Sequence, residues 1–125
     1  MDKELNVETL FTASMHKGVV QVIYEHFGMG MPIQIPFGQA VCRTDIDELA
    51  LSVRTFNALK RGGIRTVGDV IDAITQGKLM GVRNLGCKSS AEIKIQILEY
   101  GYAHLSEIEQ KTFLQKMIVQ DGRVN

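Results

Sequence analysis

The chain of 125 residues has no tryptophan, two prolines, two cysteines and no net charge. Two cysteines, Cys42 and Cys87, are too few for a disulfide-rich secreted domain, and we expect both to be reduced thiols. The longest apolar run, from Gly18 to Ile23, is far too short to span a bilayer. No apolar stretch with a small-residue cleavage site follows the first residues, so we expect no signal peptide. These absences predict a cytoplasmic protein that does not bind membranes.

The balanced charge excludes a protein that coats nucleic acid through bulk charge, because such domains are usually strongly basic. A local basic face is compatible with this balance, since basic residues gather in one half of the chain. Among them are Arg54, Lys60, Arg61, Arg65, Arg83, Lys88 and Lys94. If the chain binds DNA, we expect a modest affinity that a partner or a second copy would reinforce.

Residue types that carry catalysis or bind metals lack a suitable spacing. The three histidines, His16, His26 and His104, are scattered and show no ligand-like spacing to the cysteines, so we expect no metal site. The sequence shows no nucleophile–base pair, no phosphate-binding glycine loop after a strand and no carboxylate pair. We therefore expect no catalytic residues, no cofactor and no enzymatic activity.

Apolar residues make up 45% of the chain, which is enough for a core of mostly Leu, Ile, Val and Met. Residues 1–27 are predicted to form one or two helices, with Asn6 as an N-cap. The β-branched run 19–24 would also suit a strand, and we favour a helix. Glycines and prolines alternate with apolar residues in 28–38, which prevents a helix and predicts an extended linker that lies against other residues.

From residue 45 onward the pattern is helical, after an extended or single-turn entry. Ser52 is predicted to cap a helix that ends near Arg61, with Val53, Phe56 and Leu59 on its apolar face. Thr66 should cap a second helix, and a short third helix lies around residues 78–80. A fourth helix runs from about residue 88 to 100, where Gly101 is expected to end it.

A final helix is predicted to begin at a capping box formed by residues 106–109 and to end near Val119. Its apolar stripe is made of Ile108, Phe113, Leu114, Met117 and Ile118. Taken together, the elements predict an all-α fold. We expect a compact bundle of short helices with helical appendages at both ends.

Two short segments, residues 58–70 and 80–93, share one pattern. Each has an apolar residue before a glycine-containing turn, a small or polar residue after it, and then a new amphipathic helix. A tight turn between helices needs glycine where φ becomes positive, and the next helix begins with free N–H groups that suit phosphate oxygens. The pair is typical of helix-hairpin-helix turns that bind a nucleic-acid backbone. The second copy carries Lys88 and Ser89 at the start of its helix.

Two blocks, LSVRTFNAL at residues 51–59 and NLGCKS at residues 84–89, closely resemble one family. This is the C-terminal domain of the bacterial RNA polymerase alpha subunit, and the resemblance covers about residues 45–101. It implies a compact bundle of short helices that binds the minor groove of A·T-rich DNA upstream of promoters and contacts transcription factors. The assembly domain of the alpha subunit has no counterpart here, so we expect a stand-alone relative.

The resemblance implies six DNA-binding residues: Arg54, Asn57, Gly86, Lys88, Ser89 and Glu92. Arg54 would enter the minor groove, whose enhanced negative potential attracts a guanidinium, with Asn57 beside it. Gly86 would let the backbone approach a phosphate, while Lys88 supplies charge and Ser89 a hydroxyl group. A carboxylate cannot contact a phosphate directly, so we expect Glu92 to orient Arg54 or Lys88.

Departures from the family pattern lower these expectations. Cys87 stands where the family has a further lysine, and this removes a positive charge from the phosphate-binding face. Glu48 matches one acid of the patch that contacts sigma factor, but Ala50 replaces the other, so Glu48 is at most a partner contact. The segment 75–79 is one residue longer than usual and lacks the acids of the usual activator surface.

The sequence therefore predicts three parts. Residues 1–42 form an appendage with a linker, residues 43–103 a DNA-binding domain, and residues 104–125 a helix and tail. The first hypothesis is a DNA-binding protein of transcription. The alternative is a non-enzymatic interaction module that binds polymerase, a transcription regulator or itself, with DNA binding weakened or lost. Both can hold, because a homodimer would double the DNA contacts.

Overall fold

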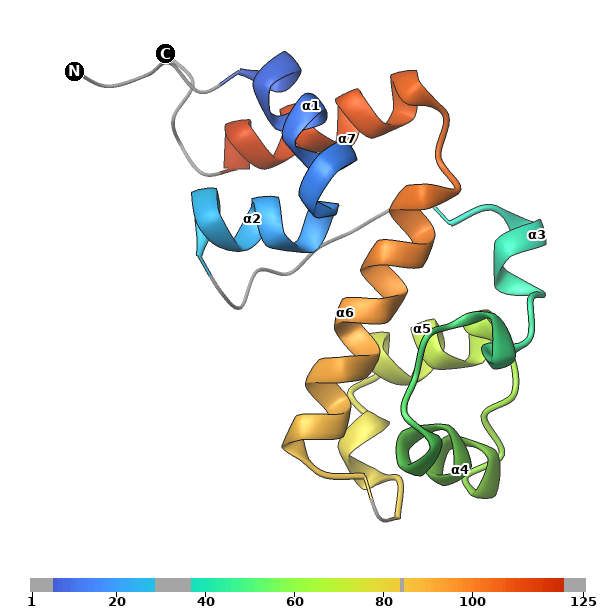
Figure 1. Cartoon of the computed structure of the whole chain (residues 1–125). Coiled ribbons are helices and arrows are strands. Elements are labelled where there is room, and N and C mark those ends of the chain that lie inside the picture. Colours follow the sequence, from blue (N-terminus) through green and yellow to red (C-terminus); the bar gives the residue numbers. More distant parts are fainter. Residues whose placement is uncertain (1–5, 29–36, 84, 121–125) are drawn as a thin grey trace. The chain divides into compact units, whose positions relative to one another are not determined.

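The computed structural model describes residues 6–28, 37–83 and 85–120. These ranges contain seven α-helices, two short 3-10 helices and no β-strand, which confirms the all-α prediction (Figure 1). None of their helices has both the length and the apolar character needed to cross a bilayer. The contacts divide the protein into unit 1, within residues 1–35 and 102–125, and unit 2, within residues 36–101. The expected boundaries after residues 42 and 103 stay a prediction.

Unit 1 contains the helices α1 (Val7–Lys17), α2 (Val19–Phe27) and α7 (Glu107–Gln120). The side chain of Asn6 accepts the N–H of Thr9 at 2.9 Å, as expected of the N-cap. Gly18 separates α1 from α2 with a φ of 88°, a left-handed conformation that glycine adopts without strain. The β-branched run 19–24 is helical, which confirms the interpretation that we favoured.

The core of unit 1 lies between α1, α2, α7 and the end of α6. Gln110 donates from its side-chain nitrogen to the carbonyl of Tyr102 at 2.8 Å, which places that residue of α7 on the inner side. Ile108 lies two residues before Gln110, which rotates it about 200° around the helix, towards the outer side. It is 77% exposed, so its place in the predicted stripe is wrong. The buried apolar residues are Leu10, Val19, Val22, Ile23, Tyr102, Phe113, Leu114, Met117 and Ile118.

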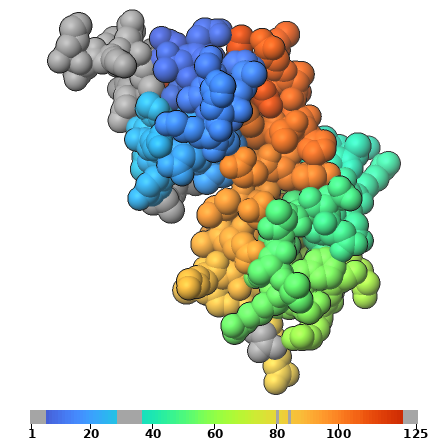
Figure 2. Space-filling view, viewed as in Figure 1, coloured from blue at the N-terminus to red at the C-terminus, as the bar shows by residue number. Residues whose placement is uncertain are grey.

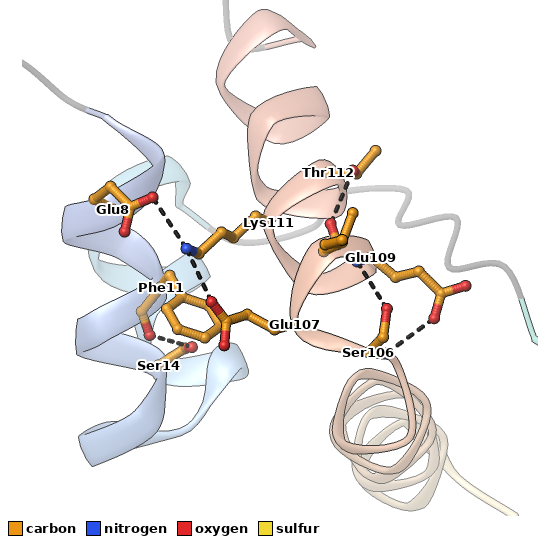
Figure 3. A network of polar contacts seen from close by, with 9 residues as sticks. Glu8, Phe11, Ser14, Ser106, Glu107, Glu109, Lys111 and Thr112 are labelled. Atoms are coloured by element: carbon orange, nitrogen blue, oxygen red, sulfur yellow. Dashed lines mark hydrogen bonds and ion pairs between the residues drawn. The ribbon is translucent and has the colours of Figure 1, made fainter.

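Polar contacts hold the start of α7 (Figure 3). Ser106 and Glu109 form the predicted capping box, in which each backbone N–H donates to the other residue's side chain. The ammonium group of Lys111 lies 3.1 Å from the carboxylates of both Glu8 and Glu107 (Figure 3), so it links α7 to α1. These exposed ion pairs add little free energy, and the apolar core carries most of the stability of unit 1.

Unit 2 begins with α3 (Gln39–Cys42) and the 3-10 helix η1 (Ile46–Glu48), followed by α4 (Val53–Arg61) and α5 (Val67–Thr75). The 3-10 helix η2 (Leu79–Gly81) and the helix α6 (Cys87–Ala103) complete it, although α6 ends beyond residue 101. The short helix α3 was not anticipated, and residues 29–36 of the expected linker lie outside the described ranges. The core is made of Ile46, Leu49, Ala58, Leu59, Ile64, Val67, Val70, Ala73, Leu79, Leu85, Ile93 and Ile97.

The buried face of α4 is rotated from the one that the sequence predicted. Val53 is 75% exposed, whereas Thr55, Ala58 and Leu59 are buried and Phe56 lies at the edge of the core. Ser52 is the N-cap, as expected, and its side chain accepts the N–H of Thr55. The sequence pattern placed Val53 on the inner face because its side chain is apolar. Thr55 can be buried instead because its hydroxyl has hydrogen-bond partners in Ser89 and Glu92 of α6.

The two glycine turns differ in conformation. Gly63 has a φ of 83°, as expected for the turn between α4 and α5. In the second turn neither Gly81 nor Gly86 has a positive φ, so the prediction is wrong there. The backbone reaches α6 through η2 and two further short-range bonds, from the N–H of Val82 to Leu79 and of Leu85 to Val82. Such bonds tighten the backbone without a left-handed residue.

Gly101 does not end α6, because the helix continues to Ala103. The glycine is buried, and a Cβ atom built on it would collide with the ring of Phe37. Close approach of this ring, and not a helix stop, therefore requires the glycine. The contact also places Phe37, a residue of the expected linker, against α6 within unit 2.

We expect Gly101→Ala to lower the free energy of unfolding by about 1–3 kcal/mol, because the ring of Phe37 must shift to admit the new methyl group. In a Phe37→Ala background the same change should raise stability by up to about 1 kcal/mol, since alanine is favoured over glycine inside a helix. Urea unfolding of the four proteins measures both effects. Equal effects of the glycine substitution in the two backgrounds would contradict the assignment.

Candidate functional site

The predicted DNA-binding residues come from two helices of unit 2. Arg54 and Asn57 are both exposed and lie three residues apart in α4, so they share one side of that helix. Gly86 precedes α6, and Lys88 and Ser89 lie in its first turn. The glycine and the lysine are exposed, whereas the serine is half-buried.

The carboxylate of Glu92, in α6, joins the starts of these two helices. It accepts the backbone N–H of Ser52, the N-cap of α4, and also lies 3.2 Å from the hydroxyl of that serine. The hydroxyl of Thr55 lies 2.7 Å from the same carboxylate. In the space-filling view the start of α6, in amber, adjoins the green segment that contains α4 (Figure 2).

Thr55 is the buried centre of this polar cluster, with 1% of its surface exposed. Because a carboxylate only accepts, the threonine hydroxyl gives its one hydrogen to Glu92. Its lone pairs then face the hydroxyls of Ser52 at 3.0 Å and Ser89 at 3.1 Å. The hydroxyl of Ser89, expected to face a phosphate, therefore has a partner inside the protein. We call Ser52, Thr55, Ser89 and Glu92 the cap cluster.

The expected role of Glu92 needs correction. We predicted that it orients Arg54 or Lys88, but its carboxylate bonds to Ser52 and Thr55. Within the described ranges no ion pair joins this carboxylate to either basic side chain. Its charge faces the N-terminus of α4, where the helix dipole is positive. Glu92 thus holds the helix that carries Arg54 and leaves the guanidinium itself unpaired by this carboxylate.

The starts of α5 and α6 differ in their availability to an anion. At α5 the carboxylate of Asp69 accepts the N–H groups of Arg65 and Thr66, at 3.1 and 3.2 Å. In α6 the N–H of Ser90 makes a helical bond to Gly86, and the first turn before it meets no carboxylate among the described residues. A helix start of this kind favours an anion, so the second turn, but not the first, suits a phosphate.

The approach to α6 is open. A Cβ atom built on Gly86 would meet nothing within 4 Å. Cys87, the first residue of α6, is exposed and its thiol is free. Lys88 is exposed beside it, so a partner that reaches the N–H groups of this turn also meets the lysine.

Two other predicted features lie elsewhere. Glu48 is exposed on η1 and takes no part in the cap cluster. Lys60, in the last turn of α4, lies over the ring of Phe56, with its nitrogen 5.3 Å from the ring centre.

No three His, Cys, Asp or Glu side chains gather as a metal site in the part of the protein that the structure describes.

Sequence reasoning found Ser52 as a cap but missed the role of Thr55. A signal was present, because a capping box places Glu or Gln three residues after the N-cap, and Thr55 occupies that place in α4. The missing acid showed only that α4 does not complete a capping box from its own sequence, and the structure places Glu92 in that role.

The environment of Glu92 sets its protonation. Desolvation raises its pKa, but hydrogen bonds from the backbone of Ser52 and from the hydroxyls of Thr55 and Ser52 outweigh this effect. The pKa of Glu92 therefore lies below its ordinary value. The carboxylate is charged at neutral pH, as a cap of a helix N-terminus requires.

Comparisons with known proteins place unit 2 in one family. Residues 37–99 match the family described as the C-terminal domain of the bacterial RNA polymerase alpha chain. Over 57 residues the protein is 47% identical to the DNA-directed RNA polymerase subunit alpha of Rubrobacter xylanophilus. The match covers 46% of this sequence and 18% of that relative, so the protein spans only a small part of the relative's length. No solved structure matches it.

We expect Glu92→Gln to lower the free energy of unfolding at pH 7 by about 1–3 kcal/mol, because bonds to a charged acceptor become bonds to a neutral one. The pKa of Glu92 is lower in the folded protein than in the unfolded chain. Its contribution to the free energy of unfolding is therefore complete above the ordinary pKa of about 4.3, and it disappears as the pH falls through the pKa of the folded protein. The difference between parent and variant should therefore shrink in acid. Urea unfolding between pH 7 and pH 3 measures it.

Glu48→Gln serves as the control, because this exposed carboxylate lies outside the cap cluster and should change stability by less than about 0.5 kcal/mol. A gap between the parent and Glu92→Gln that stays constant from neutral to acid pH would refute the role of the charged carboxylate.

Proposed function

The protein belongs to the family of the C-terminal domain of the bacterial RNA polymerase alpha subunit, and we propose that it binds DNA in transcription. We propose further that it contacts the minor groove of A·T-rich duplex. The observation that carries the proposal is that the cap cluster joins the first turn of α4, with Arg54, to the open start of α6, with Lys88. One helix offers a guanidinium and the other an anion site.

Each part of this surface has a distinct role in the proposal. The guanidinium of Arg54 enters the narrow groove of A·T-rich sequence, where the potential is most negative, and Asn57 contacts DNA beside it. The N–H groups at the start of α6 and the ammonium group of Lys88 bind a phosphate. Gly86 leaves room for the backbone to approach. The turn before α6 then works as the second half of a helix-hairpin-helix.

Ser89 and Glu92 enter the proposal in changed roles. Their side chains bond to the start of α4, so they hold the surface in place and leave the phosphate to the backbone N–H groups and Lys88. This division explains how an acidic residue can lie within a DNA-binding surface. The carboxylate is satisfied by α4 and does not face the duplex backbone.

The charge distribution supports a modest affinity. The stretch 36–101 has nine Lys and Arg against seven Asp and Glu, whereas the rest of the sequence has five against seven. Unit 2 alone is therefore basic, and only slightly. A weakly basic surface binds DNA with strong salt dependence and benefits from a partner. RNA polymerase, a transcription regulator or a second copy of the protein would supply the missing affinity.

A second candidate function rests on unit 1. Its helices α1, α2 and α7 lie outside the matched residues 37–99 and have their own apolar core. An additional helical unit on a DNA-binding domain suits contact with another protein. The candidate is a non-enzymatic interaction module in which DNA binding is weakened or lost. We propose no reaction and no cofactor for either function.

Fluorescence anisotropy of labelled A·T-rich and G·C-rich duplexes, at about 50 and 200 mM salt, tests the proposal. We expect the parent to prefer the A·T-rich duplex and to weaken steeply with salt. Arg54→Ala should bind that duplex about tenfold more weakly and lose the preference, because the inserted guanidinium is absent.

The matched control is Arg61→Ala, since this exposed arginine lies in the last turn of the same helix, away from the cap cluster. It should change the affinity less than about twofold. If Arg54→Ala and Arg61→Ala bind alike, the site is misassigned. If the parent binds neither duplex at low salt, the interaction module is the better function.

A gain of affinity is expected from Cys87→Lys, because this exposed first residue of α6 lies beside the proposed phosphate. One added phosphate contact should raise the slope of log affinity against log salt by about one. The affinity at low salt should rise with it, while Cys87→Ser, which adds no charge, should match the parent. The same anisotropy titrations over a salt series measure the slopes, and an unchanged slope would place the phosphate elsewhere.

A further inference from the structure

The helices α4, α5 and α7 each begin with a serine or threonine cap. In two of them a carboxylate of the same helix accepts the N–H of the cap residue. In α5 the carboxylate of Asp69 accepts the N–H of its own cap residue, Thr66, and in α7 Glu109 does the same for Ser106. In α4 the third position holds Thr55, which has no carboxylate. The N–H of the cap residue is instead bound by Glu92, 40 residues further along the sequence.

The start of α4 therefore cannot form its complete cap without α6. A helix whose cap residue is bound by an acid of the same helix can rotate or shift as a rigid body and keep its capping hydrogen bonds. In α4 a shift of the first turn breaks the bonds from Ser52 and Thr55 to the carboxylate together. The cap consequently fixes the position of the first turn of α4 against α6.

Thr55 makes this linkage specific. It is 1% exposed, and its hydroxyl contacts side chains at the starts of both helices, namely Ser52 of the α4 cap and Ser89 and Glu92 of α6. Valine has nearly the same shape but carries a methyl group where threonine has its hydroxyl, so it would fill the same space without needing a hydrogen-bond partner. The hydroxyl thus serves the bonds between the helices, and packing alone would not require it.

We propose that Thr55 is a positioning residue for DNA binding, acting through Glu92 to set the first turn of α4 against the start of α6. This inference rests on the proposed DNA-binding function. Arg54 directly precedes Thr55, and Lys88 directly precedes Ser89, so each proposed DNA contact is the neighbour of a residue in the cap cluster. The cluster determines the spacing between the group that enters the groove and the group that binds the phosphate.

The test compares Thr55→Val with Thr55→Ser by anisotropy on the A·T-rich and G·C-rich duplexes. Thr55→Val should bind the A·T-rich duplex about fivefold more weakly, with a smaller preference over G·C and an unchanged salt slope, because the charges remain but their spacing is lost. Thr55→Ser keeps the hydroxyl and should restore both the affinity and the preference.

Val70→Ala is the control for stability, because this residue of α5 is fully buried in the core of unit 2 and lies outside the cap cluster. Affinities are corrected for the folded fraction, measured by circular dichroism under the same conditions. The control should keep the preference for A·T-rich duplex. If Thr55→Val proves unfolded, Glu92→Gln replaces it, with the same expected loss of preference.

The outcomes separate the two proposals. If the parent binds no DNA, the proposed function fails and the inference fails with it. If the parent binds with a preference for A·T-rich duplex and Thr55→Val or Glu92→Gln binds equally well, only the positioning role is overturned. If Val70→Ala loses the preference to the same extent, the effect is one of general stability and the positioning role is overturned as well.

Discussion

The arrangement of the candidate DNA surface depends on one carboxylate placed at a helix start. Glu92 accepts the N–H of Ser52 and the hydroxyl of Thr55, and so gives α4 the acid that its own sequence lacks. Burial raises the pKa of Glu92, but the hydrogen bonds from Ser52 and Thr55 outweigh it, and the pKa is lowered as a result. Because the bonds cross from α6 to α4, they fix the first turn of α4 against α6.

The positions of Asp69 and Glu92 also explain why the helix starts after the two glycine turns differ in their availability to an anion. The turn before α5 is closed by Asp69, which takes the N–H groups that an anion would need. Glu92, in the second turn of α6, is directed to another helix, and the first turn of α6 meets no carboxylate among the described residues. The same helix therefore supplies the carboxylate that holds α4 and has a first turn that suits an anion. The difference follows from residues that the shared pattern leaves out: Asp69 lies three residues after the cap Thr66, whereas serines occupy the first turn of α6.

Several elements could be predicted from local pattern because their causes are local. The caps at Asn6, Ser52 and Thr66 lie within three residues of the N–H groups that they accept. Two of the positions that failed depend on distant residues. Gly101 looked like a helix stop, but the ring of Phe37 explains it. Val53 looked like core, but the inner position belongs to Thr55, whose partners lie on α6.

The sequence by itself determined the all-α fold, most helix limits and the family, because these follow from the helical period, from capping residues and from two short motifs. It also identified Arg54 and Lys88 as candidates, since their positions lie within those motifs. Only the tertiary structure decided what Glu92 does, because a carboxylate has several possible partners and the choice depends on which helix start lies within about 3 Å. Residues 34 to 40 positions apart meet in the cap cluster, and no local rule could pair them.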